Sequence, residues 1–192
     1  MSAVQLHRTL PESSSTAYKP YQTVDFLLDA RGRKLIKNSI RIEFDALCID
    51  AVGGVSITNA SNVKLENAIG GHAFFDSFSC ETEKKGVVAE GRGPAEENGN
   101  YVLQYVSDNS YVNAQAEVDA RRQPPAFSIS PQVCFNRQGG DDYSFDKNGF
   151  IRVSMILSPT NQAVFGGAAA AKDYTLANMA LRYQTRADDG AQ

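Results

Sequence analysis

The strictest pattern in the sequence lies between Ser39 and Leu47, where apolar and polar residues alternate. The apolar set is Ile40, Ile42, Phe44 and Ala46, and the polar set is Arg41, Glu43 and Asp45. Because successive side chains of a strand point to opposite faces, this alternation predicts a β-strand with one buried face. The same period recurs at Thr23–Leu28, Phe150–Leu157 and Tyr174–Tyr183. We therefore expect sheet structure from end to end, folded as an all-β sandwich.

The length and the charge of the chain limit the number of domains and the kinds of partner that we expect. The 192 residues, 42% of them hydrophobic, suit one all-β domain. The net charge is −3 and the basic residues are scattered, which disfavours specific or general nucleic-acid binding. No apolar run reaches the roughly 20 residues of a membrane-spanning helix, and the first residues lack the order of a signal peptide. We expect neither a spanning segment nor secretion by a signal peptide.

The three cysteines, Cys48, Cys80 and Cys134, are spaced for neither a disulfide framework nor a zinc site. Each lies in or beside an apolar or aromatic stretch, so we expect buried thiols in a reducing compartment.

Three segments are expected along the chain: an extended N-terminal arm at 1–22, a single sandwich domain at 23–185 and a polar tail at 186–192. The arm is rich in serine and proline without periodicity, so we expect it to be ordered only against a neighbouring subunit. Its deletion (residues 2–20) is expected to weaken assembly without unfolding the sandwich. Asp29–Gly32 is expected to turn the first strand back toward the second.

Turn and helix signals fill the middle of the chain. Glu83–Gly86 predicts a hairpin turn between Ala73–Thr82 and Val87–Ala89, with Gly86 at positive φ. Pro94 followed by acidic residues predicts a short helix, and Val112–Arg121 a second one. Pro131 places the strand Phe127–Phe135 at a sheet edge or a bulge. Asp146–Gly149 predicts a compact turn before Phe150–Leu157.

The sequence contains little that indicates a catalytic site or a metal-binding site. The chain has two histidines, and His7 lies in the expected arm, so a nucleophilic triad would need His72. The two glycines before it, Gly70 and Gly71, are explained more simply by a junction between a loop and a strand than by a ligand that approaches the backbone. Asp141, Asp142, Asp146 and Asn148 lie near Gly149 as in a calcium loop, but the spacing puts Met155 where a bidentate glutamate is needed. We expect no catalytic, cofactor-binding or metal-binding residues and no cofactor.

Two further patterns have structural explanations. Gly91-Arg-Gly93 lacks the remaining residues of a nucleotide-binding loop and is interpreted as a tight entry into a helix. Tyr101, Tyr105 and Tyr111 are compatible with a sugar-stacking platform, but the chain contains no tryptophan and core or interface packing is favoured.

The order of these segments resembles one jelly roll of the capsid proteins of tailless icosahedral viruses, in particular the first jelly roll of the double jelly-roll major capsid proteins. The resemblance covers about residues 20–187. It rests on the following stretches: YQTVDFLLDARGRKLIKNSIRIEFDAL, GGHAFFDSFSCETEKKGVVAEG, FSISPQVCFN, FIRVSMILSP and YTLANMALRYQT. A double jelly-roll protein needs a second such domain, so the resemblance implies a single jelly-roll shell subunit, a vertex protein or a minor capsid protein.

The resemblance implies an antiparallel jelly roll with one or two short helical insertions and no enzymatic activity. It implies self-assembly into a homo-oligomer and contacts with other capsid proteins, made through loops and the N-terminal arm. The location would be the virion of a bacteriophage or similar virus, after synthesis in the host cytoplasm, and a position next to an internal virion membrane is compatible with it. The alternative is a phage fibre or spike domain or a carbohydrate-binding sandwich.

Overall fold

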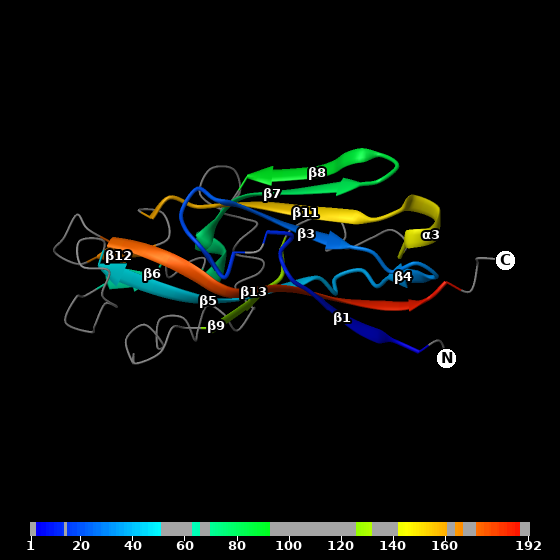
Figure 1. Ribbon diagram of the computed structural model, residues 1–192, viewed down its shortest axis with the longest axis horizontal. Helices are drawn as coiled ribbons and strands as arrows, with labels where there is room; N and C mark the ends of the chain where they lie inside the picture. The colour runs from blue at the N-terminus through cyan, green and yellow to red at the C-terminus, as the bar shows by residue number, and fades with distance from the viewer. Residues whose placement is uncertain are drawn as a thin grey trace.

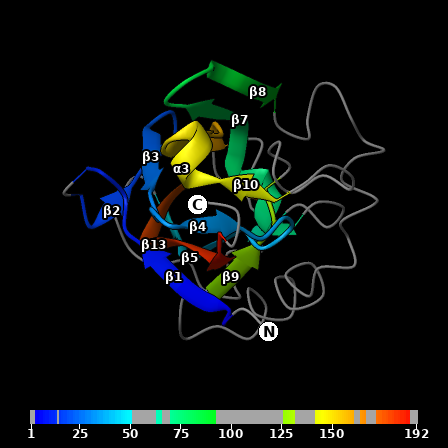
Figure 2. The ribbon, with the colours of Figure 1, turned by 90° about the vertical axis from the view of Figure 1, so that its right-hand side faces the viewer.

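The computed structural model describes residues 3–13, 15–50, 63–65, 70–92, 126–131, 142–160, 164–166 and 172–188. Two antiparallel sheets pack face to face in it, so the all-β sandwich is confirmed (Figures 1 and 2). The strands of the first sheet pair in the order β10 (Tyr143–Ser144), β4 (Arg33–Leu35), β13 (Lys172–Ala187), β5 (Arg41–Asp50) and β9 (Ala126–Ile129). β4 and β5 follow each other along one edge of β13, and β1 (Gln5–Thr9) and β2 (Ala17–Tyr18) pair with its opposite edge.

The second sheet has the order β3 (Thr23–Leu28), β11 (Ile151–Leu157), β7 (Phe75–Thr82) and β8 (Gly86–Arg92). A small ribbon of β6 (Val63–Leu65) and β12 (Val164–Gly166) lies at the end of the sandwich opposite to α3 (Figure 1). Two short helical turns complete the described elements: η2 (Gly70–Phe74) and α3 (Phe145–Asn148).

The strand pairing is nested. β1 pairs with β13, β3 with β11, β5 with β9, and β7 with β8, so these four pairs lie one inside the other along the sequence. Successive members of the set alternate between the sheets except at the β7–β8 hairpin. A hairpin of strands wound around two sheets in this way is a jelly roll, which confirms the predicted fold class.

The core follows the predicted alternation. Ile40, Ile42, Phe44 and Ala46 are at most 2% exposed, whereas Arg41 between them is exposed. They face Val24, Phe26 and Leu28 of β3 and Val153 and Met155 of β11, all fully buried. Phe44 is the centre of an aromatic cluster, with ring centroids 5.8, 5.3 and 5.2 Å from those of Phe74, Phe75 and Phe127. Such contacts add to the hydrophobic gain of burial.

Several local predictions are confirmed. β7 and β8 form the expected hairpin, and Gly86 in its turn has φ of 64°. Gly32 in the turn after β3 has φ of 77°. β9 pairs with β5 alone among the described strands and Pro131 follows it, in agreement with an edge position. The long C-terminal strand is β13.

The connection after the first strand was predicted wrongly. β3 and β5 do not form a hairpin, because they belong to opposite sheets. Between them the chain crosses the end of the sandwich and forms β4, whose Leu35 is 1% exposed and pairs in register with Thr185 of β13. A three-residue strand with one inward side chain is too short to show a period in the sequence. Phe145–Asn148 is likewise one turn of α-helix rather than a simple turn, with Ser144 as its N-cap.

Residues from both ends of the chain belong to the first sheet. β1 and β2 pair with β13 of the same chain, and Tyr18 is 3% exposed, so residues 5–9 and 17–18 are ordered without a neighbouring subunit. At the other end Arg186 and Ala187 belong to β13, and the Asp188 side chain is buried. The helices expected after Pro94 and at Val112–Arg121 lie outside the described residues. In the part that is described, no helix is long and apolar enough to cross a membrane.

Candidate assembly surfaces

His72, the residue weighed for catalysis, lies beside the core of the sandwich. His72 lies in η2 and is 8% exposed. A Cβ on the preceding Gly71 would lie 2.7 Å from Cδ1 of Phe127 and 3.1 Å from Cγ2 of Ile129. The glycine therefore allows η2 to approach β9 closely, which explains it without a ligand. Cys80 is fully buried, as expected for a core thiol. The placement of Cys134 lies outside the described residues, as does the burial of Cys48.

The described residues of the calcium-like loop, Asp142, Asp146 and Asn148, each contact another part of the chain. Asp142 Oδ2 lies 2.7 Å from Arg186 Nε, and Asp146 Oδ1 accepts a hydrogen bond from the Gly32 backbone at 2.8 Å. Asn148 donates its side-chain amide to the Ser144 carbonyl at 3.1 Å. Within the described ranges, no three His, Cys, Asp or Glu residues are grouped as a metal site would require. The structure thus separates these residues rather than bringing them together.

Gly91 and Arg92 lie in a strand, and the helix expected after them lies outside the described residues. They are the last two residues of β8 and pair with Phe78 and Ser77. Tyr101, Tyr105, Tyr111 and Asp141 lie outside the described residues.

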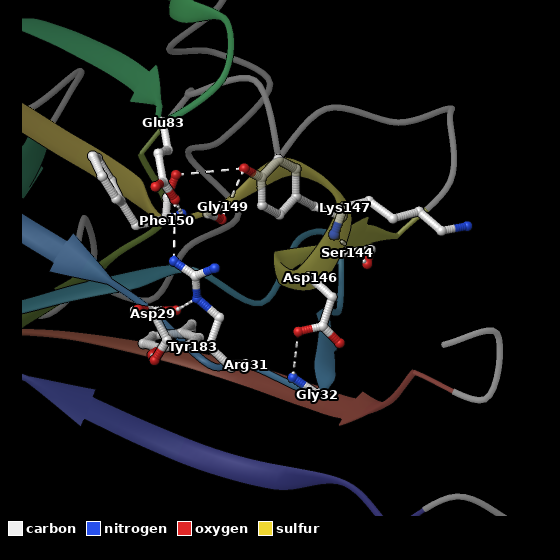
Figure 3. Close-up of polar contacts among 11 residues, drawn as sticks. Asp29, Arg31, Gly32, Glu83, Ser144, Asp146, Lys147, Gly149, Phe150 and Tyr183 are labelled. Atoms are coloured by element: carbon white, nitrogen blue, oxygen red, sulfur yellow. Dashed lines mark hydrogen bonds and ion pairs between the residues drawn. The ribbon is translucent and has the colours of Figure 1, made fainter. Parts of the chain in front are cut away.

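A polar network joins three turns at one end of the sandwich, which we call the loop end: Asp29–Gly32, Glu83–Lys85 and Asp142–Phe150 (Figure 3). Arg31 lies at its centre, with Nε 3.0 Å from Asp29 and a terminal nitrogen 3.1 Å from Glu83. The Asp29 carboxylate, aided by Glu83, raises the pKa of Arg31 above its usual value. These side chains are exposed, so each ion pair contributes little to stability on its own. Their effect is to hold three turns in one arrangement.

Glu83 fixes the turn after α3. Its carboxylate accepts from the Phe150 backbone at 3.3 Å, and its own N–H donates to the Phe150 carbonyl at 3.1 Å. Gly149 has φ of 81° and ψ of −161°, a conformation that side chains oppose. A Cβ there would lie 2.1 Å from Glu83 Oε2 and 2.5 Å from Glu83 Cβ. Only glycine fits beneath this glutamate.

Asp188 anchors the last strand at the same end. Its buried carboxylate lies 2.8 Å from Lys34 Nζ and accepts from the Ser144 hydroxyl at 2.5 Å. Ser144 also caps α3 by accepting from Lys147 N–H at 3.3 Å. β4, α3 and the end of β13 are therefore fastened through one carboxylate, a role that the tail sequence gave no reason to expect.

The second surface is the N-terminal segment, residues 3–13 and 15–22, which bridges the two sheets. Its β1 and β2 pair with β13 of the first sheet. Between them, Glu12 N–H donates to the Asp25 carbonyl on the edge of β3 at 2.8 Å, and the Glu12 carboxylate lies 3.1 Å from Arg152 Nε of β11. The segment thus connects the edges of the two sheets on one side of the sandwich, and we call it the clasp.

This segment also carries exposed apolar side chains. Val4, Leu6 and Leu10 are 60%, 57% and 59% exposed. Their spacing of two and four places them on one face of an extended chain. A groove of about 440 Å³ lies between the segment and β13, lined by Arg8, Leu10, Ser13, Thr16, Asn178 and Met179 among others. Exposed apolar residues grouped on one short segment indicate a contact surface.

The fold and these surfaces define a class of structure, a jelly-roll sandwich with a rigid loop end. No family model matches the sequence, and no curated protein matches it. Among solved structures, the chain is similar to one described as "PBCV-1 virus capsid, quasi-atomic model", with a TM-score of 0.59 and 11% sequence identity. The alignment covers 97% of this chain and 42% of that chain. The resemblance to a jelly-roll capsid protein is thereby confirmed at the level of the fold.

Proposed function

We propose that this protein is a structural subunit of an icosahedral viral capsid, in the shell, at a vertex or as a minor component. The nested jelly-roll pairing, which aligns over nearly the whole chain with a viral capsid structure, is the observation that carries the proposal. The protein acts in the virion of a bacteriophage or similar virus, after synthesis in the host cytoplasm. It acts through its surfaces and without catalysis, binding copies of itself and other capsid proteins.

The geometry suits such a role. This chain spans about two-fifths of the capsid chain that it resembles. The loop end offers neighbours a fixed polar surface, because Arg31 ties the turns after β3 and β7 together. The outer face of the N-terminal segment offers the apolar side chains of Val4, Leu6 and Leu10, with the charged Arg8 between the two leucines. Polar rims around apolar contacts are the usual composition of interfaces.

Oligomeric mass tests the proposal directly. Light scattering coupled to size exclusion, with negative-stain electron microscopy, is run over a wide range of protein concentration. We expect trimers, pentamers or closed shells. A strict monomer at the highest concentration would contradict the proposal and favour the alternative of a fibre, spike or carbohydrate-binding module, for which a glycan array is the next measurement.

A pair of matched variants tests whether the N-terminal segment makes the contact. Leu6→Ser removes an apolar side chain that is 57% exposed on β1, and Ile156→Ser removes one that is 41% exposed on β11. Burying the exposed part of a leucine in an interface is worth about 1 kcal/mol, or roughly a fivefold change in the association constant. We expect that loss for Leu6→Ser and no change for Ile156→Ser. Equal association of both variants and the parent would refute a contact through β1.

A further inference from the structure

His7 lies at the contact between the N-terminal segment and β13. Its ring stacks on Tyr183, its partner in the strand register, with centroids 4.7 Å apart and planes 10° from parallel. Its Nε2 lies 2.8 Å from the hydroxyl of Thr185, which is fully buried. The ring thus makes the main inward side-chain contact of a strand whose five residues are all exposed or half-buried.

The Thr185 hydroxyl decides which form of His7 fits. Arg33 Nε donates to this oxygen at 2.5 Å, and a terminal nitrogen of Arg33 donates to the Ala3 carbonyl at 2.9 Å. Because this oxygen already accepts from Arg33, its own proton is available for Nε2 of a neutral His7. Protonated His7 would instead bring a second cation to an oxygen already bound by a guanidinium.

Among the described residues, no carboxylate forms an ion pair with His7. From β4 it faces Arg33, and from β13 the uncharged Tyr183 and Thr185. The neighbouring carboxylates are occupied elsewhere: Asp29 by Arg31, Glu12 by Arg152 and Glu43 by Arg182. On its own strand the next charged residue is Arg8, another cation. In agreement, burial and then the charge of Arg33 lower the pKa of His7 from its ordinary 6.5.

We propose that His7 is a pH-operated latch, whose protonation releases β1 from β13 while the rest of the sandwich stays folded. The release is confined to β1, because Tyr18 is buried and the Glu12 carboxylate pairs with Arg152 of β11. A detached β1 presents Leu6 and its backbone to another chain. Its use in assembly rests on the function proposed above, whereas the latch itself is a property of one chain.

The pH dependence of the release follows from the difference in the pKa of His7 between attached and detached β1. A detached His7 has the ordinary pKa of 6.5 and the attached one a lower value, so acidification favours the detached form. The ratio of detached to attached β1 rises as the pH falls below 6.5 and levels off below the pKa of the attached residue. Each unit of difference between the two pKa values multiplies that ratio tenfold.

Hydrogen exchange of the β1 amides tests the latch in the full-length monomer. Protection factors, corrected for the intrinsic effect of pH, are measured from about pH 8 to about pH 5, where carboxylates stay ionised. We expect protection of residues 5–9 to fall several-fold in the parent and to stay level in His7→Gln, whose amide accepts the Thr185 proton without titrating. Protection of β5 is the internal control and stays constant.

A second variant separates the latch from mere loss of packing. Arg33→Gln removes the competing cation, so the pKa of His7 should rise toward 6.5 and the pH response of β1 should shrink. The chain has only two histidines, so their NMR ring signals are assigned with His7→Gln alone. A response that persists in His7→Gln, or a parent whose β1 protection does not change with pH, would overturn the inference. Both measurements are made on the monomer, so they test the latch whether or not the protein assembles. The capsid function is tested separately by the oligomeric mass.

Discussion

Gly149→Ala tests the physical account of the loop end most directly. The substitution meets two independent obstacles. The backbone at φ of 81° and ψ of −161° is open almost only to glycine, which costs a side chain about 1–3 kcal/mol. The new Cβ would also lie 2.5 Å from Glu83 Cβ, an atom that side-chain rotation does not move away, and overpacking of this kind costs about 1–3 kcal/mol.

The combined loss expected is about 2–6 kcal/mol in the free energy of unfolding. Gly86→Ala is the matched control, since Gly86 also has positive φ, 64°, but a Cβ there meets nothing within 4 Å. It should lose only about 1–2 kcal/mol, the backbone contribution. Urea unfolding followed by circular dichroism measures both, and the comparison is valid where the m-values agree.

The double variant Gly149→Ala with Glu83→Ala separates the two obstacles. Shortening Glu83 removes the contact with its carboxylate but leaves its Cβ in place, so we expect partial recovery. Equal losses in Gly149→Ala and Gly86→Ala would show that Glu83 does not confine this turn, and the rigid loop end would then be wrong.

Three other predictions concern stability. Phe44→Ala should lower the free energy of unfolding by about 3–5 kcal/mol, measured by urea titration, because it empties the centre of the aromatic cluster; a loss below 1 kcal/mol would contradict that packing. Asp188→Ala should cost about 1–3 kcal/mol by the same assay, since Lys34 and Ser144 lose their buried acceptor; an unchanged midpoint would show that Asp188 is no anchor. Because the pKa of His7 is lowered in the fold, its contribution to stability is fully present above 6.5 and lost as the pH falls through the folded pKa, so the stability difference between the parent and His7→Gln should shrink on acidification.

The inward faces of the long strands could be predicted from the sequence, and the arrangement of the strands could not. Ile42 and Phe44 alternate with charged residues because only one side of β5 contacts the core, and this alternation is visible in the sequence. Nothing local states that β3 lies opposite β5 rather than beside it, because either arrangement buries the same faces. The family resemblance implied a jelly roll, which the nested pairing confirms, but the turn expected between β3 and β5 was wrong.

The candidate surfaces were the least predictable part, because long-range contacts make them. Arg31 meets Glu83 across 52 positions and Gly32 meets Asp146 across 114, so neither pair leaves a local motif. The N-terminal segment did contain a signal in Val4, Leu6 and Leu10, spaced as in a strand. It is easily missed because the inward set of β1, Gln5, His7 and Thr9, is polar, so the apolar side faces solvent instead of the core.

The polar inward face of β1 determines which contacts hold the N-terminal segment in place. A strand whose inner side chains are polar gains little from burial, so β1 is held mainly by its backbone ladder, by His7 on Tyr183 and by the contacts of Arg33. Tyr18 is different, because it is buried in the core and its removal would cost the sandwich directly. Deleting residues 2–20 would therefore remove a core side chain together with the clasp, contrary to the expectation of an independent arm. Substitutions confined to β1, such as Leu6→Ser and His7→Gln, change the clasp alone and are the variants that separate assembly from folding.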